Sequence, residues 1–157
     1  FTSSTTFDVV SSMFHVVNYQ TSNANLEAFF STAYKALKPG GQLVFDFWYG
    51  PGVLFDKPAA RIIEVKTNEY EIVRKATPKL RINDNCVDVT YDLKVQYQDD
   101  SLEPVSFTET HSMRYLFVPE LEFFSRDKFI IENAHAWRTH TDPQESDWSA
   151  VCIMRRL

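Results

Sequence analysis

An acid and a histidine stand two residues apart in a segment where apolar and polar residues alternate. Glu109 and His111 fall on one face of a strand predicted over residues 105–117. They share that face with Phe107, Met113, Tyr115 and Phe117. Burying an unpaired polar group there would be costly, so the two side chains are expected to interact. Either Glu109 orients His111 as a general base in an acceptor pocket, or the pair only holds the sheet together.

A second polar group lies in the apolar segment QLVFDFWYG. Asp46 alternates with two phenylalanines, and Trp48 and Tyr49 follow at the predicted end of the strand. Strand ends line ligand clefts in open α/β sheets. Trp48 and Tyr49 therefore either bind substrate or pack in the core, and Asp46 either serves the site or hydrogen-bonds a loop.

A third group of candidate ligands lies near the C-terminus. It comprises His135, His140, Asp142, Glu145 and Asp147. Their spacing fits no known metal-ligand pattern, so we interpret them as solvated loop residues and expect no metal site. The two cysteines, Cys86 and Cys152, are too few for a disulfide framework and also lack metal spacing.

The composition is that of one aromatic-rich globular domain. The chain has 157 residues, 44% hydrophobic and 15% aromatic, and a net charge of −5. Its basic residues are scattered, so we expect no nucleic-acid partner. It has neither an apolar run long enough to span a membrane nor a signal peptide, so we expect no membrane contact and a reduced, cytoplasmic protein.

The first fifty residues predict a βαβ unit. Residues 7–14 form an apolar strand, residues 23–37 carry an apolar stripe at helical spacing, and residues 42–48 form a second strand. The Lys-Pro-Gly-Gly segment between helix and second strand ends the helix. The two strands should pair in parallel.

The remainder predicts a different arrangement. The β-rich segments 61–75, 86–97 and 105–117 are interpreted as a three-stranded antiparallel sheet. A short helix begins at Pro119, and strands over 129–138 and 148–155 close the chain.

Several motifs in this pattern resemble a known family. They are FDVVSSMFHVVNYQ, the KPGG after the helix, LVFDFWYGP, HSMRYLFVPELEFF and the final DWSAVCIMRR. Together they resemble the C-terminal part of class I S-adenosylmethionine-dependent methyltransferases, and the insertion is similar to that of sugar-amine N-methyltransferases. The resemblance implies an α/β fold with an incomplete Rossmann-like sheet, the family's fourth to seventh strands. It divides the chain into a core part over 1–50, an inserted sheet over 51–118, and closing elements over 119–157.

The resemblance also implies a cofactor site after the fourth strand. S-adenosylmethionine would contact Met13, Phe14 and His15, with His15 near the transferred methyl group. There His15 either lines the pocket or takes a proton from the acceptor, unless it is a loop histidine with a backbone partner. Asn18 and Tyr19 follow on the same loop, where they either serve the site or only pack.

The small-molecule acceptor would bind to side chains from several elements. By resemblance we assign this role to Tyr19, Trp48, Tyr49 and Arg114. Arg114 falls on the strand face opposite His111, where it either clamps an acidic substrate group or is solvated, and we expect it to be solvated.

Parts of the family pattern have no counterpart in this sequence. The family's glycine-rich loop, ribose-binding acid and adenine-binding segment are absent. We therefore expect that an N-terminal segment is missing and that these residues alone do not bind the cofactor normally. The family's strand order, 3-2-1-4-5-7-6, would leave the fourth strand at an edge. We predict that residues 7–14 pair with a second copy, as a homodimer, or with a separately supplied N-terminal piece.

The function implied by the resemblance is methyl transfer to a nitrogen or oxygen atom of a small molecule. Such a displacement needs the acceptor held against the methyl group and a base where the acceptor bears a proton. Two alternatives remain. One is a non-catalytic fragment that self-assembles through its fourth strand, and the other is a β module that binds a small molecule on its aromatic face.

Overall fold

The chain folds into two compact units. The computed structural model describes residues 5–99 and 101–157, so residues 1–4 of the predicted core segment and residue 100 lie outside the described part. The core unit extends to Lys57 and resumes over Met113–Leu157. The sheet unit spans Pro58–Ser112.

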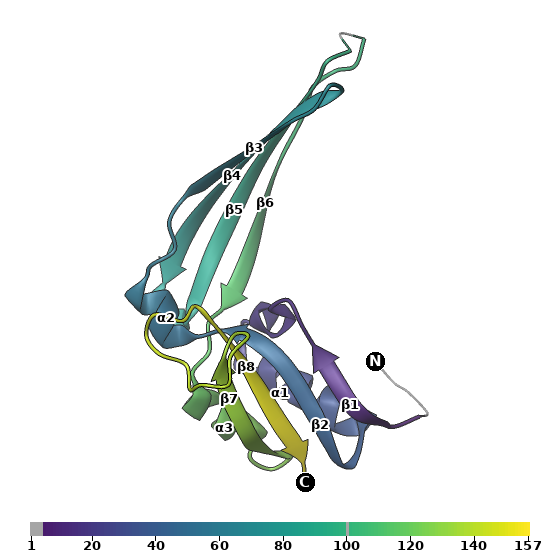
Figure 1. Ribbon diagram of the computed structural model, residues 1–157, viewed down its shortest axis with the longest axis vertical. Coiled ribbons are helices and arrows are strands. Elements are labelled where there is room, and N and C mark those ends of the chain that lie inside the picture. The colour runs from purple at the N-terminus through teal and green to yellow at the C-terminus, as the bar shows by residue number, and fades with distance from the viewer. Residues whose placement is uncertain (1–4, 100) are drawn as a thin grey trace. The chain divides into compact units, whose positions relative to one another are not determined.

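The core unit contains a sheet in the order β1-β2-β8-β7 (Figure 1). β1 (Phe7–Ser12) pairs in parallel with β2 (Leu37–Trp48), and a helix connects them, as the sequence predicts. β8 (Ser149–Arg156) is antiparallel to both β2 and β7 (Phe129–Ala136). Within the described residues, β1 is therefore an edge strand.

The connecting helix α1 (Asn23–Ala36) begins at a side-chain cap. Ser22 Oγ accepts a hydrogen bond from the backbone N of Asn25 at 3.1 Å, which satisfies one of the free N–H groups of the first turn. The helix ends before Lys-Pro-Gly-Gly, where Gly40 has a φ of 76°, a conformation that a side chain would strain. The buried face of α1 consists of Leu26, Phe30, Ala33 and Ala36.

The core lies between this sheet and the helices α1 and α3 (Val118–Ser125). The Phe30 ring on α1 contacts Phe45 on β2 and Phe129 on β7, with centroid separations of 6.1 and 6.2 Å. Such inclined aromatic pairs add to the free energy gained by burial. Strand alternation supplies the remaining core residues, which include Leu43, Phe47, Ala150, Cys152 and Met154.

A short helix that the sequence did not predict follows β2. α2 (Gly50–Phe55) has a proline in its first turn, where the missing N–H costs no hydrogen bond. Gly52 lies so close to the chain that an added Cβ would be 2.0 Å from the backbone O of Asp147. This contact holds the loop before β8 against α2.

The sheet unit has four strands in its described residues, so the prediction of three was wrong. Their order is β3-β4-β5-β6, with bounds β3 (Arg61–Lys66), β4 (Tyr70–Arg81), β5 (Cys86–Tyr97) and β6 (Val105–Arg114). The segment 61–75 reverses at Thr67, whose Oγ1 accepts hydrogen bonds from the backbone N of Glu69 and Tyr70 at 3.2 and 3.1 Å. This side-chain turn lets β3 fold back antiparallel onto β4.

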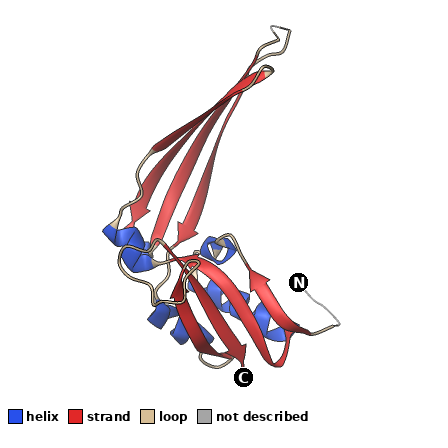
Figure 2. Cartoon of the chain, in the orientation of Figure 1, coloured by secondary structure: helices blue, strands red, loops and turns tan. Residues whose placement is uncertain are grey.

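The two faces of this sheet differ in polarity. On the polar face, Asp88 accepts a hydrogen bond from Ser112 at 2.6 Å and pairs with Arg81 at 2.9 Å. The Ser112 hydrogen bond, with help from Arg81, lowers the pKa of Asp88. The described residues of the sheet unit contain no α-helix (Figure 2).

Candidate active site

His15 and Asp46 meet at the carboxyl ends of β1 and β2. Asp46, 1% exposed, accepts a hydrogen bond from the backbone N of His15 at 3.0 Å. Its other oxygen lies 2.9 Å from His15 Nδ1, although the ring is not turned to align a hydrogen bond there. A small ring rotation would complete it and leave Nε2 as the nitrogen that can accept a proton.

The backbone that presents His15 is unusual. β1 ends at Ser12, two residues before the predicted end, because Phe14 and His15 have left-handed φ values of 64° and 60°. Such conformations cost bulky residues on the order of 1 kcal/mol or more each. The turn leads directly into the 3-10 helix η1 (Val16–Tyr19) and leaves the Phe14 side chain 88% exposed.

Asn18 fixes this loop from within. Its side chain is fully buried; Oδ1 accepts a hydrogen bond from the backbone N of Trp48 at 3.2 Å, and Nδ2 donates to the backbone O of Arg114. The oxygen and the nitrogen of the side-chain amide thus join η1, β2 and the end of β6. Asn18 therefore packs as a structural bridge beneath His15 rather than facing a ligand.

Two tryptophans lie beside His15. The Trp48 ring is 6.3 Å from the imidazole and 5.4 Å from the ring of Trp148. Trp148 Nε1 donates to the backbone O of Asp56 at 2.8 Å. Trp148 was not predicted as a site residue, because only the fold brings its loop to the end of β2. Tyr49 is half-buried and contacts Phe47 in the core at 6.5 Å.

Arg114 is buried, so the expectation that it is solvated was wrong. Its guanidinium donates to Asn23 Oδ1 at 2.9 Å and forms an ion pair with Glu120. It also lies 5.7 Å from the centre of the Phe124 ring. The strand ends at this residue and passes into the core unit, which encloses a side chain that strand alternation alone would leave in solvent.

The remaining candidates differ in their surroundings. Tyr19 is 46% exposed at the end of η1. In the sheet unit, Glu109 Oε1 and His111 Nε2 are 3.1 Å apart, and the His111 ring is 5.5 Å from that of Tyr91. The expected Glu-His contact is therefore present, and His15 lies in the other unit.

The two C-terminal histidines lie beside each other. His135 and His140 have ring centroids 6.0 Å apart. Within residues 5–99 and 101–157, no three His, Cys, Asp or Glu side chains are grouped so that they could hold a metal ion.

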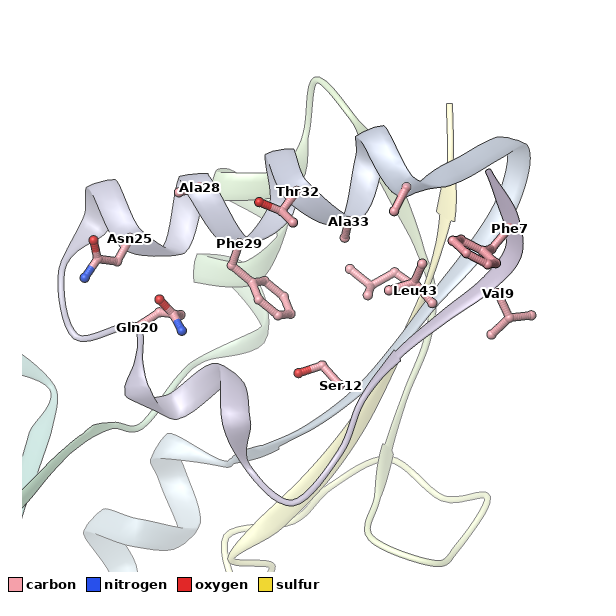
Figure 3. Close-up of a pocket in the computed structure, with 12 residues that line it drawn as sticks. Phe7, Val9, Ser12, Gln20, Asn25, Ala28, Phe29, Thr32, Ala33 and Leu43 are labelled. Carbon is pink, nitrogen blue, oxygen red and sulfur yellow. The ribbon is translucent and has the colours of Figure 1, made fainter. Parts of the chain in front are cut away.

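A groove of about 580 Å³ runs between α1 and the edge strand β1. Its walls are mainly apolar, with Phe29 directed from α1 toward β1, and Gln20 and Ser12 at one end (Figure 3). The segment Met13–His15 is not among its lining residues. The groove therefore follows the unpaired side of β1 and stops short of His15.

Comparison with known proteins shows the fold. No family model and no curated protein matches the chain. Solved structures do: an S-adenosylmethionine-dependent methyltransferase from Clostridium acetobutylicum aligns with a TM-score of 0.75 and 15% identity over 99% of this chain. The sugar N-methyltransferase KedS8 from Streptoalloteichus aligns with a TM-score of 0.76 and 16% identity over 98%.

A third structure, CalS10 from Micromonospora echinaspora, is an amino pentose methyltransferase with bound S-adenosylmethionine. It aligns with a TM-score of 0.72 and 16% identity over all of this chain. The chain spans only 60%, 58% and 61% of the three proteins, respectively. The resemblance to S-adenosylmethionine-dependent methyltransferases is thus confirmed at the level of the fold.

No helix in the described part of the chain is both long and apolar enough to span a bilayer.

Proposed function

We propose that this chain forms the acceptor side of an S-adenosylmethionine-dependent methyltransferase that acts on a nitrogen or oxygen atom of a small molecule. The observation that carries the proposal is the His15–Asp46 contact at the ends of two parallel strands, where open α/β sheets bind ligands. The fold supports it, because its solved counterparts are methyltransferases. Two of them are named for sugar substrates, so we include an amino sugar among the acceptors.

We assign the strands of the core unit to the family's fourth to seventh strands. The observed order β1-β2-β8-β7 corresponds to 4-5-7-6 in the family's sheet. On this assignment residues 1–50 begin the methyltransferase core, 51–118 are an insertion and 119–157 complete the core. The insertion then enters between the fifth and sixth strands.

The residues present fit only part of the cofactor. Met13, Phe14 and His15 are suited to its methyl-bearing end, since they follow β1 on an exposed turn. The sequence has no glycine-rich loop of the family's kind to receive its amino-acid end, and Gly50 and Gly52 belong to α2. We therefore propose that another segment supplies that loop, from the same chain or another one, and adds a strand to the free edge of β1. The apolar groove beside α1 would receive the accompanying helix, because parallel strands are normally covered on both faces.

His15 is the proposed general base. The cofactor supplies an activated methyl group, so the protein needs mainly to hold the acceptor in line and remove its proton. Bound S-adenosylmethionine would supply the methyl group, and His15 Nε2 would accept the proton that the acceptor loses. Asp46, which lies 2.9 Å from Nδ1, would stabilise the resulting imidazolium. Trp48 and Trp148, with Tyr19 and Tyr49, are proposed to contact the acceptor.

Two further assignments complete the proposal. The Glu109–His111 pair is a second candidate for the base, supported by its 3.1 Å contact. Because its guanidinium is already bonded to Asn23 and Glu120, Arg114 would reach an acceptor only by exchanging those partners. A reduced, cytoplasmic setting is also part of the proposal, since Cys86 and Cys152 are buried and do not form a disulfide.

Binding of S-adenosylhomocysteine tests the cofactor assignment. Without a glycine-rich loop we expect a dissociation constant of about 1 mM, which corresponds to a binding free energy of about −4 kcal/mol. Such weak binding is detectable by NMR as changes in the amide chemical shifts of a ¹⁵N-labelled chain. The changes should be concentrated at Met13–His15 and the Trp48 indole. Changes confined to the sheet unit, or none at all with about 5 mM ligand, would contradict the assignment.

Kinetics test the base. In a preparation with measurable methyltransferase activity, His15→Ala should lower kcat about 100-fold or more. Asp46→Asn should lower kcat less and leave KM nearly unchanged. His140→Ala is the matched control, since His140 is exposed and its imidazole lies beside that of His135 on β7. An effect of His15→Ala no larger than that of the control would refute the role.

One rival function has its own observation. Phe7 and Val9 on the edge strand are 42% and 54% exposed, which favours a non-catalytic module that assembles through β1, including pairing with a second copy. The two differ in ligand binding: a module that only assembles should leave the Met13–His15 amides unchanged by S-adenosylhomocysteine. The small-molecule-binding β module has less support, since a pocket on the sheet unit is lined in part by charged residues such as Lys75, Asp92 and Lys94.

A further inference from the structure

One residue holds both ends of the segment that leads from the candidate base to α1. The backbone O of Arg114 accepts a hydrogen bond from Asn18 Nδ2, and the Arg114 guanidinium donates to Asn23 Oδ1 at 2.9 Å. Asn18 lies in η1 and Asn23 is the first residue of α1. The two contacts therefore tie residues 18–23, which we call the clamped loop, to the end of β6.

A buried ion pair keeps Arg114 in place. The side chains of Arg114 and Glu120 are only 7% and 15% exposed, and they form an ion pair within the core unit. Glu120 lies in the first turn of α3, where it also accepts a hydrogen bond from the backbone N of Phe117 at 3.4 Å. An arginine that loses its partner becomes a buried unpaired charge, which is strongly unfavourable. The pair therefore restricts Arg114 to the conformation that reaches Asn23.

The clamped loop determines where two of the candidate site residues lie. The backbone N of Asn18 donates to the backbone O of His15 at 3.0 Å, so the start of the clamped loop is joined to the candidate base. Tyr19, which is 46% exposed, belongs to the clamped loop itself. A displacement of about 1 Å at a reacting group can lower a rate about 100-fold. Order in the clamped loop therefore bears on the reaction, although the Arg114 side chain is bonded elsewhere.

We propose that Arg114 and Glu120 are positioning residues, which act on the reaction through the clamped loop rather than by binding the acceptor. The inference rests on the proposed function for the roles of His15 and Tyr19, whereas the order of the clamped loop is a property of the chain alone. The role differs from a purely structural one, because apolar side chains can replace a buried ion pair without loss of stability but cannot bond to Asn23.

A double variant separates positioning from stability. Arg114→Met with Glu120→Leu replaces the ion pair by apolar side chains, so the midpoint of urea unfolding should stay close to that of the unmodified chain. Hydrogen exchange measured by NMR should nevertheless become about tenfold or more faster at the hydrogen-bonded amides of the clamped loop. These amides belong to Asn18, Gln20 and Thr21.

Arg155→Met is the control for the double variant. It removes the ion pair in which Arg155 Nε lies 2.7 Å from Glu132 Oε1, and the Arg155 side chain is 46% exposed. Because that pair lies on β8 and β7, its loss should leave exchange in the clamped loop unchanged.

A second variant keeps the proposal testable if the double variant does not fold. Asn23→Ala removes only the contact at the far end of the clamped loop, at an exposed position where the Arg114–Glu120 pair remains intact. It should also speed exchange in the clamped loop. Asn25→Ala is its matched control, since Asn25 is exposed in the same turn of α1 and makes no contact with Arg114 through its side chain. Unmodified exchange rates in every folded variant of the clamp would overturn the proposal.

Kinetics connect the clamped loop to the reaction. In a preparation with measurable methyltransferase activity, the double variant should lower kcat about tenfold or more, and by a larger factor than it raises KM. A loosened loop with unchanged kcat would overturn the positioning role if His15→Ala is impaired in the same preparation. A loosened loop together with a fully active His15→Ala variant would instead refute the proposed function, and the clamp on the loop would stand.

Discussion

Replacing Asn18 with alanine should destabilise the core unit more than its small change in volume suggests. The variant removes two hydrogen bonds and leaves the backbone N–H of Trp48 and the backbone C=O of Arg114 without their partner. A net hydrogen bond contributes about 1 kcal/mol, and each buried polar group left unsatisfied costs roughly 1–3 kcal/mol. Since Asn18 is 0% exposed, water does not replace it without rearrangement. We expect a loss of about 3 kcal/mol.

Urea unfolding followed by tryptophan fluorescence measures this loss, since Trp48 and Trp148 both belong to the core unit. Asn18→Ala should lower the midpoint without changing the slope of the transition. Asn25→Ala is the matched control, because Asn25 is exposed on α1, where alanine is a good helix former, and it should shift stability by no more than about 0.5 kcal/mol.

Two outcomes would refute this reasoning. Equal effects of the two asparagine variants would mean that the bridge beneath His15 contributes nothing to stability. A large loss of stability with unchanged backbone amide shifts at His15 would mean that the bridge does not position the loop.

Three further predictions follow from local chemistry. Burial raises the pKa of the Cys152 thiol to about 12, so a thiol reagent should modify it only at the rate of unfolding, as measured by mass spectrometry. The pKa of Asp88 is lowered in the folded chain, so its contribution to stability is lost as the pH falls below the ordinary value of 3.8. Asp88→Asn should therefore make the melting temperature less dependent on pH in that range. Gly52→Ala should destabilise the core unit by about 3 kcal/mol or more in urea, since its Cβ would overlap the Asp147 carbonyl; an unchanged midpoint would contradict that contact.

Local sequence patterns predicted most of the secondary structure. The apolar stripe over residues 23–37 predicted α1 within one residue of its observed bounds. The β-rich segment predicted over 86–97 has the same bounds as β5. These features depend on neighbours in the chain, so short-range physics is sufficient to predict them.

Two predictions were wrong because the tertiary structure differs from what the local sequence pattern indicates. Residues 61–75 contain a reversal held by the Thr67 hydroxyl, and a run of β-prone residues does not reveal it. Arg114 alternates as an exposed residue should, but the chain enters the core unit at that point and surrounds its side chain.

By itself the sequence determined the βαβ unit, the amphipathic sheet and the resemblance to a methyltransferase, because periodicity and motif order are properties of the linear chain. Only the tertiary structure brought His15 to Asp46, 31 residues away, and Asn18 to the carbonyl of Arg114, 96 residues away. Those contacts depend on the parallel register of β1 and β2 and on two left-handed residues in the turn between strand and helix. The register and the turn are stabilised by packing from distant segments, so no local pattern in the sequence specifies them.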